Sequence, residues 1–315
     1  MTNDLPAAPA APEVHLHSFA HALGDPVDIT LLDHPGVSGR LDALTAEGLR
    51  HCRVSERSAP HLGAASARAA LAAADGLVPG AVVLATESRT PSPAQILWET
   101  LRSVPLPRTP GLVVSGNGCG NFAPALRAAR GVLLTERVPG VLLTFADRLT
   151  TPSRYMPDGD TVMSDSAASC LVTAGPPGRP SFRVLAVATS VQADLVPEER
   201  VLKGARTVIK AVREALGRIN SSIPEPERGF DWFITGNYSA TTRRFLTTAA
   251  RMPEEKAYSP HHATHGHCYS ADQLITLAAL EADGRLTHGR RVLLLATSAR
   301  SWSLTALERV DPDPA

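Results

Sequence analysis

Short apolar runs alternate with longer amphipathic segments along most of this chain. The apolar runs are rich in Val, Leu and Ala, and such alternation is typical of buried strands joined by helices. It predicts strands at 81–85, 111–114, 140–144, 168–172, 182–191, 232–234 and 291–296. It predicts helices near 62–75, 93–102, 119–131, 200–218, 240–251 and 269–283. The pattern therefore indicates an α/β fold.

A cluster of Pro and Gly at 175–180 interrupts the chain near its middle. The alternation of strands and helices recurs on both sides of this cluster, so we predict two related halves, 13–176 and 177–315. No repeat at the level of individual residues links the two halves. Residues 1–12 are rich in Pro and Ala and lack the features of a secretion signal, so we expect a flexible N-terminal tail.

Composition excludes several classes of protein. The chain has 31 basic and 31 acidic residues and no dense run of Lys or Arg, which argues against nucleic acid or a membrane surface as a partner. No stretch approaches the roughly 18 apolar residues that a membrane span requires. The four cysteines, Cys52, Cys119, Cys170 and Cys268, have no paired spacing, as expected for reduced thiols in the cytoplasm.

Cys119 lies where the strand predicted at 111–114 gives way, through a Gly-rich turn, to a helix. Backbone N–H groups and the helix dipole stabilise an anion at such a junction, so the thiolate form of the cysteine is favoured. The same amides can hydrogen-bond the oxyanion that forms when sulfur attacks a thioester. Alternatively, Cys119 fills a tight turn as a small buried side chain. Cys52 and Cys170 are better explained as surface or core filler.

Several further segments follow in a characteristic order. They are the helix at 122–131, the strand at 140–149 with its Ala-Asp-Arg, the turn at 163–168, the segment 232–256 and the last strands at 289–296 and 301–302. Together with the cysteine turn they resemble the ketoacyl synthase III-like branch of the thiolase superfamily over nearly the whole chain. The resemblance implies the thiolase fold, in which two similar strand-helix halves form a five-layered αβαβα sandwich.

The chain departs from this family at two catalytic positions. Members that condense an acyl group with a malonyl thioester use Cys, His and Asn. The family's His position falls on Gly236, and its Asn position falls on His267. Asn237 stands beside the vacated position and offers an amide donor, so the resemblance implies Cys119, His267 and Asn237 as the catalytic residues. Decarboxylative condensation needs two donors on one enolate oxygen, and loss of one costs about two to three orders of magnitude in rate.

Acyl transfer needs only a thiolate, an oxyanion hole and a base. We therefore predict an acyltransferase of specialised metabolism without a permanently bound cofactor. Cys119 would accept the acyl group of an acyl-CoA or acyl-carrier-protein thioester, and His267 would help a hydroxyl or amine acceptor to attack it. Two alternatives stay open: a decarboxylative ketoacyl synthase in which His267 and Asn237 replace the missing pair, and a non-catalytic partner subunit of a ketosynthase.

The resemblance also implies oxyanion donors on the backbones of Cys119 and Ala299, and a homodimer paired through the segment 105–112. The candidate substrate-binding residues are Phe122, Ser298, Arg300, Arg243 and Arg244. The two arginines of the predicted helix at 240–251 suit CoA phosphates or an acidic carrier protein, or form a solvated helix face. Arg300 is favoured as a surface charge over a partner for a substrate carboxylate.

The segment from His261 to Cys268 contains four imidazoles and a thiol, which are donors that zinc accepts. Their spacing matches no compact metal site, and Pro260 and Gly266 mark the segment as a loop. We therefore expect catalytic or polar loop roles for these histidines and no bound metal.

Overall fold

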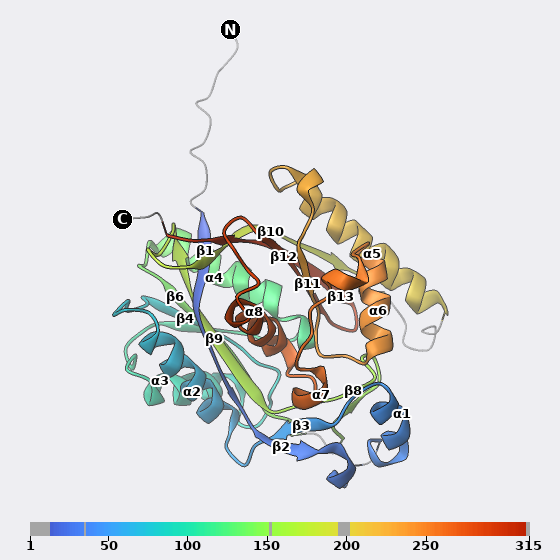
Figure 1. Ribbon diagram of the computed structural model, residues 1–315. Helices are drawn as coiled ribbons and strands as arrows, with labels where there is room; N and C mark the ends of the chain where they lie inside the picture. The colour runs from blue at the N-terminus through green and yellow to red at the C-terminus, as the bar shows by residue number, and fades with distance from the viewer. Residues whose placement is uncertain (1–12, 35, 151–152, 195–201, 313–315) are drawn as a thin grey trace.

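The computed structural model describes residues 13–34, 36–150, 153–194 and 202–312 (Figure 1). The tail predicted at 1–12 lies outside the described residues. Within them, one large sheet has the strand order β11-β12-β13-β10-β1-β9-β6-β4-β5. Its strands are β1 (Val14–Leu23), β4 (Ala81–Ala85), β5 (Gly111–Val114), β6 (Val141–Asp147), β9 (Ser166–Ala174), β10 (Ser181–Val191), β11 (Trp232–Ile234), β12 (Arg291–Thr297) and β13 (Ser301–Val310).

Two short ribbons lie outside the large sheet. They pair β2 (Asp25–Asp28) with β3 (His51–Val54) and β7 (Tyr155–Met156) with β8 (Thr161–Val162). The helices are α1 (Leu41–Ala46), α2 (Ala59–Ala72), α3 (Pro93–Ser103), α4 (Phe122–Glu136), α5 (Leu202–Asn220), α6 (Ala240–Ala249), α7 (His262–His265) and α8 (Asp272–Ala282). All the strands and helices that the sequence predicts are therefore present, with ends that differ by a few residues.

The large sheet bends so that the elements form five layers (Figure 1). Helices α2 and α3 pack outside the part made of β1, β9, β6, β4 and β5. Helices α4 and α8 lie in the middle and contact strands of both parts of the sheet. Helix α5 packs on the outer face of β10 and β13, with α6 beside it. This arrangement confirms the predicted αβαβα sandwich.

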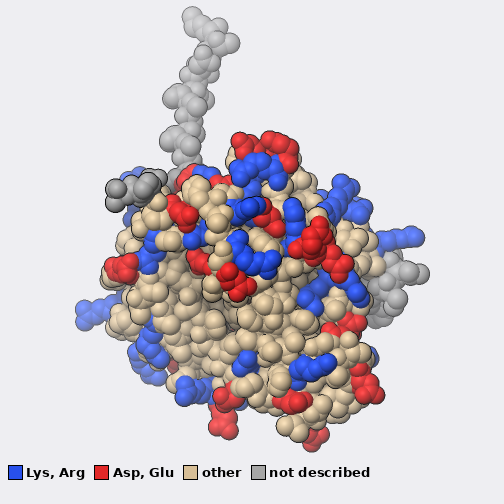
Figure 2. All heavy atoms as spheres, viewed as in Figure 1, with Lys and Arg blue, Asp and Glu red and all other residues tan. Residues whose placement is uncertain are grey.

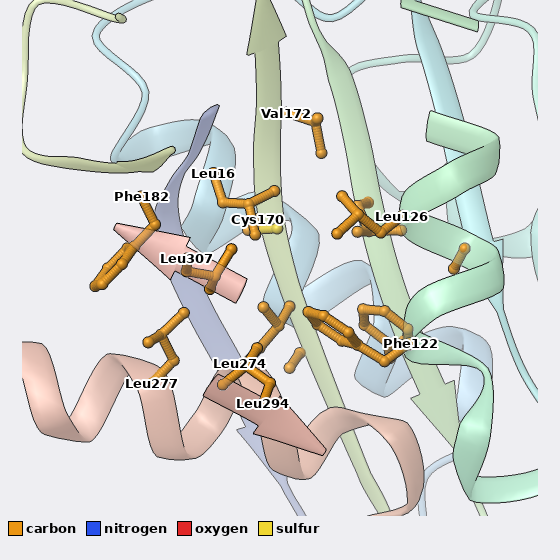
Figure 3. Close-up of a cluster of buried hydrophobic side chains, with 14 of the residues drawn as sticks. Leu16, Phe122, Leu126, Cys170, Val172, Phe182, Leu274, Leu277, Leu294 and Leu307 are labelled. Carbon is orange, nitrogen blue, oxygen red and sulfur yellow. The ribbon is translucent and has the colours of Figure 1, made fainter. Parts of the chain in front are cut away.

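The middle layer contains the largest apolar core. Figure 3 shows side chains from α4, α8 and both parts of the sheet meeting there, with Phe122 and Leu126 facing Cys170 and Leu274. The rings of Phe122 and Phe145 stack with centroids 5.6 Å apart. Burial raises the pKa of the Cys170 thiol, as expected for an unreactive core residue. The core fixes the start of α4, which directly follows the turn that holds the candidate nucleophile.

Strand β1 is missing from the sequence-based prediction although it joins the two parts of the sheet. It pairs antiparallel with β9 on one side and β10 on the other. Its histidines His15 and His17 are each only 1% exposed, and the His15 ring bonds to Ser181 Oγ at 3.0 Å. Ser18, with φ of 56°, interrupts the register between His17 and Ala20. Buried histidines and an irregular register hide the alternation by which a strand is normally recognised.

Figure 2 shows basic and acidic side chains interspersed on the visible face, with a broad area of other residues between them. This distribution agrees with the equal numbers of basic and acidic residues in the sequence. Among the described residues, no helix combines the length and apolar character needed to cross a membrane.

Candidate active site

Cys119 lies in a short 3-10 turn, Gly118–Gly120, between β5 and α4. The predicted order of strand, turn and helix is therefore correct, but α4 begins only at Phe122. The carboxylate of Glu87 holds this turn: its Oε1 accepts hydrogen bonds from Gly116 N at 2.7 Å, Gly118 N at 3.0 Å and Asn121 Nδ2 at 2.7 Å. Two of the amides expected to be free before the helix are thus occupied by a side chain from another loop.

Glu87 is in turn positioned by Asp147, the aspartate of the Ala-Asp-Arg segment that ends β6. Asp147 accepts from Glu87 N at 2.6 Å and from Ser88 N and Thr86 Oγ1, both at 3.2 Å. Burial raises the pKa of this carboxyl group to about 7, although its hydrogen bonds act in the opposite direction. The end of β6 therefore fixes the loop that supports the nucleophile turn.

His267 is fully buried and is fastened by its backbone to the strand β8 region. Its N–H donates to Val162 O at 2.8 Å, and its carbonyl accepts from Ser164 N at 2.9 Å. Its Nδ1 lies 2.5 Å from Oδ2 of Asp272, the first residue of α8. Since the backbone and Nδ1 are both held, the ring has one defined orientation.

Asp272 is completely buried and accepts four hydrogen bonds. Oδ2 accepts from His267 Nδ1 and from Asn237 N at 2.7 Å, and Oδ1 accepts from Asn237 Nδ2 at 2.9 Å and Cys268 N at 3.0 Å. Both of its oxygens are thus fully used as hydrogen-bond acceptors. Asp272 keeps the proton of the imidazole on Nδ1, so that Nε2 remains for chemistry.

Nε2 of His267 has no nitrogen or oxygen partner among the described residues. Burial disfavours the imidazolium, but the Cys119 sulfur and the Asp272 carboxylate outweigh this cost and raise the pKa of His267 to about 10. Both partners act by charge, and Asp272 acts also through its hydrogen bond with Nδ1. The ring of His267 therefore lies between two groups that favour its protonated form. This makes Cys119, His267 and Asp272 a candidate nucleophile, base and orienting carboxylate.

Asn237 supports this arrangement indirectly. Its backbone N–H and its side-chain amide both donate to Asp272, and its Oδ1 accepts from Ser259 Oγ at 3.4 Å. The sequence predicts that the Asn237 amide donates to the substrate. In the structure this amide donates to Asp272, the carboxylate that holds His267.

A cavity of about 620 Å³ opens at Cys119. Its apolar lining comes mainly from α5, α6 and the segments around β7 and β13, and includes Met156, Val208, Phe245, Leu246 and Trp302. Ser298 and Ala299 also line it. Asn117 of the nucleophile turn accepts from Ser298 Oγ at 3.2 Å and Ser301 Oγ at 2.8 Å, which ties the Ala299 loop to Cys119. The two predicted oxyanion donors therefore lie on loops that are joined to each other.

The other candidate substrate residues lie beside the cavity or away from it. Phe122 is buried in the core against Phe145, and Arg300 is exposed. Arg243 donates through Nε to Tyr238 O at 3.1 Å, and Arg244 donates to Thr241 Oγ1 at 3.5 Å. None of these four residues is part of the cavity lining at Cys119.

The remaining histidines of the cluster lie in α7 or directly before it, so the predicted loop is wrong at this point and a short helix is present. The rings of His261 and His265 stack with centroids 4.3 Å apart, and the Nη2 atom of Arg53 lies 3.2 Å from His265 Nδ1. Burial lowers the pKa of His261, and burial, with His261 and Arg53 acting in the same direction, lowers that of His265 to about 4. Within the part of the chain that the structure describes, no group of three or more His, Cys, Asp or Glu side chains could hold a metal ion.

Solved structures share this architecture over almost the entire chain. ChlB3, described as an acyltransferase, superposes with a TM-score of 0.77 and 18% identity, covering 96% of this chain and 99% of that one. The 3-oxoacyl-acyl-carrier-protein synthase III of Aquifex aeolicus gives 0.73 and 16%, covering 94% and 99%. This protein has the thiolase fold. A variant of OleA from Xanthomonas campestris also matches, with a TM-score of 0.73, 16% identity and coverage of 95% and 98%.

No family model and no curated protein sequence matches the chain. At these identities the likeness to solved structures establishes the thiolase fold and nothing finer.

Sequence reasoning missed two residues that organise the site in this thiolase fold. Asp272 opens the predicted helix at 269–283 only five positions after His267, and a buried imidazole needs an orienting carboxylate. A search for that third group would have found it. Glu87 offered no comparable signal, because it reaches Gly116 and Gly118 from a loop distant in sequence.

Proposed function

We propose that this protein is an acyltransferase that forms a thioester intermediate on Cys119. The observation that carries the proposal is the buried arrangement of Cys119, His267 and Asp272, with Cys119 in the lining of a substrate-sized cavity. It has the three parts that nucleophilic acyl transfer requires: a thiol, a base next to it, and a carboxylate that orients the base.

In the first half-reaction the Cys119 sulfur attacks the carbonyl carbon of an acyl thioester. The new carbon–sulfur bond replaces the bond to the donor, and the departing thiolate takes a proton from Nε2 of His267. In the second half-reaction Nε2 of His267 accepts the proton of the acceptor's hydroxyl or amine. The oxygen or nitrogen of the acceptor attacks the carbonyl carbon of the acyl group on Cys119. The bond to Cys119 breaks, and the protonated imidazole again pairs with the thiolate.

The backbone N–H groups of Cys119 and Ala299 are the proposed donors to the oxyanion of both half-reactions. Both residues line the cavity, and no hydrogen bond found among the described residues uses the Ala299 N–H. Loss of one donor of this kind costs about two to three orders of magnitude in rate. The hydrogen bonds of Asn117 to Ser298 and Ser301 support the required distance between the two loops.

Decarboxylative condensation is the second candidate function. The unpartnered Nε2 of His267 favours it, because this atom could donate to a thioester enolate. It would be a single side-chain donor, since position 236 is glycine and Asn237 is engaged with Asp272. Acyl transfer needs only Cys119, His267 and Asp272 with their oxyanion donors, and these are all present. A catalytically silent subunit has no need of a buried, oriented base beside Cys119.

The donor in this proposal is an acyl-CoA or an acyl-carrier-protein thioester, and the acceptor is a small molecule of specialised metabolism. No bound cofactor is required, since the chain's own residues supply every step. We further propose a cytoplasmic homodimer paired through β5, which is the last strand of the large sheet and has β4 as its one neighbour there.

Intact-protein mass spectrometry tests this function. Wild type and Cys119→Ala are incubated with a panel of acyl-CoA and acyl-carrier-protein thioesters. We expect wild type to gain the mass of one acyl group and Cys119→Ala to gain none, with Cys52→Ala as a matched control that still acylates. Adding candidate alcohols and amines then identifies the acceptor by loss of the adduct. No adduct with any donor would contradict the proposal.

A further inference from the structure

Position 236 has no room for a side chain. A Cβ atom built on Gly236 would lie 2.7 Å from Cζ of Tyr238, closer than the 3.0 Å below which real Cβ atoms essentially never come. A Cβ on Gly159 would collide with the opposite edge of the same ring, at Cδ1. Tyr238 therefore occupies a slot between two glycines. A histidine at 236 and this ring exclude each other.

Tyr238 is held on several sides and still reaches the cavity. Its hydroxyl pairs with Thr297 Oγ1 at 2.8 Å, and its ring lies against the imidazole of His267 with centroids 4.8 Å apart. It is 2% exposed, yet it lines the cavity together with Cys119. Burial, followed by the charge of Cys119, raises the pKa of the phenol, so the side chain stays neutral.

We propose that Tyr238 is the specificity-determining wall of the Cys119 site. Its ring covers the side of the acylated Cys119 on which a histidine at position 236 would act. The acceptor can then reach the acyl group only through the cavity. The inference deepens the proposed function and rests on it. Tyr238 would thus favour an acceptor bound in the cavity over water.

The physical reason is the competition between acceptor and water for one carbonyl carbon. Water attack breaks the bond to Cys119, releases a carboxylic acid and passes a proton to His267, in the same way as productive transfer. A ring packed against His267 leaves no volume for water on that side. Replacing the ring with a methyl group opens space beside the polar Nε2, which is a setting that retains water.

Thiol alkylation tests the wall without any acyl donor. Wild type, Tyr238→Ala and Tyr238→Phe are treated with iodoacetamide and with the bulkier N-phenylmaleimide, and modification of Cys119 is followed by peptide mass spectrometry. We expect Tyr238→Ala to raise the rate with the bulky reagent, relative to the small one, by about tenfold, a barrier change accessible to one side chain. Tyr238→Phe keeps the ring and should leave this ratio within about twofold of wild type.

Tyr258→Ala is the matched control. Tyr258 is another buried tyrosine, with its hydroxyl 2.5 Å from Asp283, and it is not part of the cavity lining. General loosening of the core would change both reagents alike and would affect this control as well. The proposal that Tyr238 forms the wall would be wrong if the ratio of the two alkylation rates were unchanged in Tyr238→Ala. It would also be wrong if Tyr258→Ala changed this ratio equally.

The lifetime of the acylated enzyme is the second measurement. After removal of excess thioester, we expect the Cys119 adduct to hydrolyse faster in Tyr238→Ala than in wild type, by about tenfold, and in Tyr238→Phe at nearly the wild-type rate. Equal lifetimes in all three proteins would overturn the proposed control of water. If wild type accepts no acyl group, the proposed function fails, whereas the alkylation ratio still decides whether Tyr238 forms the wall.

Discussion

Asp272 uses all of its hydrogen-bonding capacity inside the protein, on His267, Asn237 and Cys268. Its position at the start of α8 adds the favourable field of a helix N-terminus. Burial of a charge is tolerated only where such donors compensate the lost hydration. The surroundings of Asp272 therefore keep its carboxylate in the position that holds the His267 ring.

Asp272→Asn should lower the rate of acyl transfer by about 10³ to 10⁴-fold, because an amide cannot accept from all four donors and would reverse the imidazole tautomer. Steady-state kinetics with the identified donor and acceptor measure this loss. Asp283→Asn, at the other end of α8, serves as the control and should retain activity. Near wild-type turnover in Asp272→Asn would remove the carboxylate from the mechanism.

His267 should make stability depend on pH. Its pKa is raised from 6.5 to about 10 in the folded protein, so the native state binds a proton that the unfolded chain has already released over that interval. The contribution to stability is complete below pH 6.5 and is lost as the pH rises through about 10. Urea unfolding across this range should give a steeper decline for wild type than for His267→Gln. Parallel curves would contradict the raised pKa.

At the scale of elements, the candidate active site is assembled where secondary structures end. Cys119 stands between β5 and α4, Asp272 opens α8, and Asp147 closes β6. Element ends leave backbone groups without regular partners, and side chains such as Glu87 satisfy them here. The geometry of the site consequently depends on loop-to-loop hydrogen bonds as much as on the sheet.

Glu87→Gln should loosen the nucleophile turn, because a neutral amide accepts more weakly from Gly116, Gly118 and Asn121. We expect a loss of about 1–3 kcal/mol in the free energy of unfolding and slower acylation of Cys119. Denaturant titration and the mass assay measure the two effects. The exposed Glu56→Gln is the control, and identical behaviour of the two variants would show that Glu87 does not support the turn.

At the scale of the whole molecule, the site joins segments from both sides of the Pro and Gly cluster at 175–180. Cys119 precedes the cluster, whereas Tyr238, His267, Asp272 and Ala299 follow it. The middle layer of α4 and α8 and the pairing of β1 with β10 hold these segments together. The candidate site is therefore complete only in the complete sandwich.

The proposed homodimer is tested by light scattering coupled to size exclusion. Strand β5 ends the large sheet and its residues are only partly buried, which leaves one edge available for pairing. We expect a molar mass twice that of the chain at micromolar concentration. A mass equal to one chain under these conditions would contradict the dimer.

The sequence by itself determined the class of fold and the turn that holds the candidate nucleophile. Apolar runs such as 81–85 and 291–296 are buried strands because continuous apolar segments of that length have few other stable conformations. Cys119 stood out by its place in a Gly-rich turn between strand and helix, and His267 stood out because the family resemblance places it at a catalytic position. Strand β1 escaped because its buried histidines and irregular register resemble a polar segment.

Only the tertiary structure decided how these residues act. The four hydrogen bonds of Asp272, the direction of the Asn237 amide and the support from Glu87 all join segments that folding brings together. In the sequence, Gly236 indicates only that a catalytic side chain is missing. In the structure, the Tyr238 ring fills the volume that a side chain at position 236 would need. Spacing along the chain specifies local geometry. Whether a side chain at position 236 and the Tyr238 ring fit together, and whether Asp272 is buried, depends on how distant segments pack in the folded molecule.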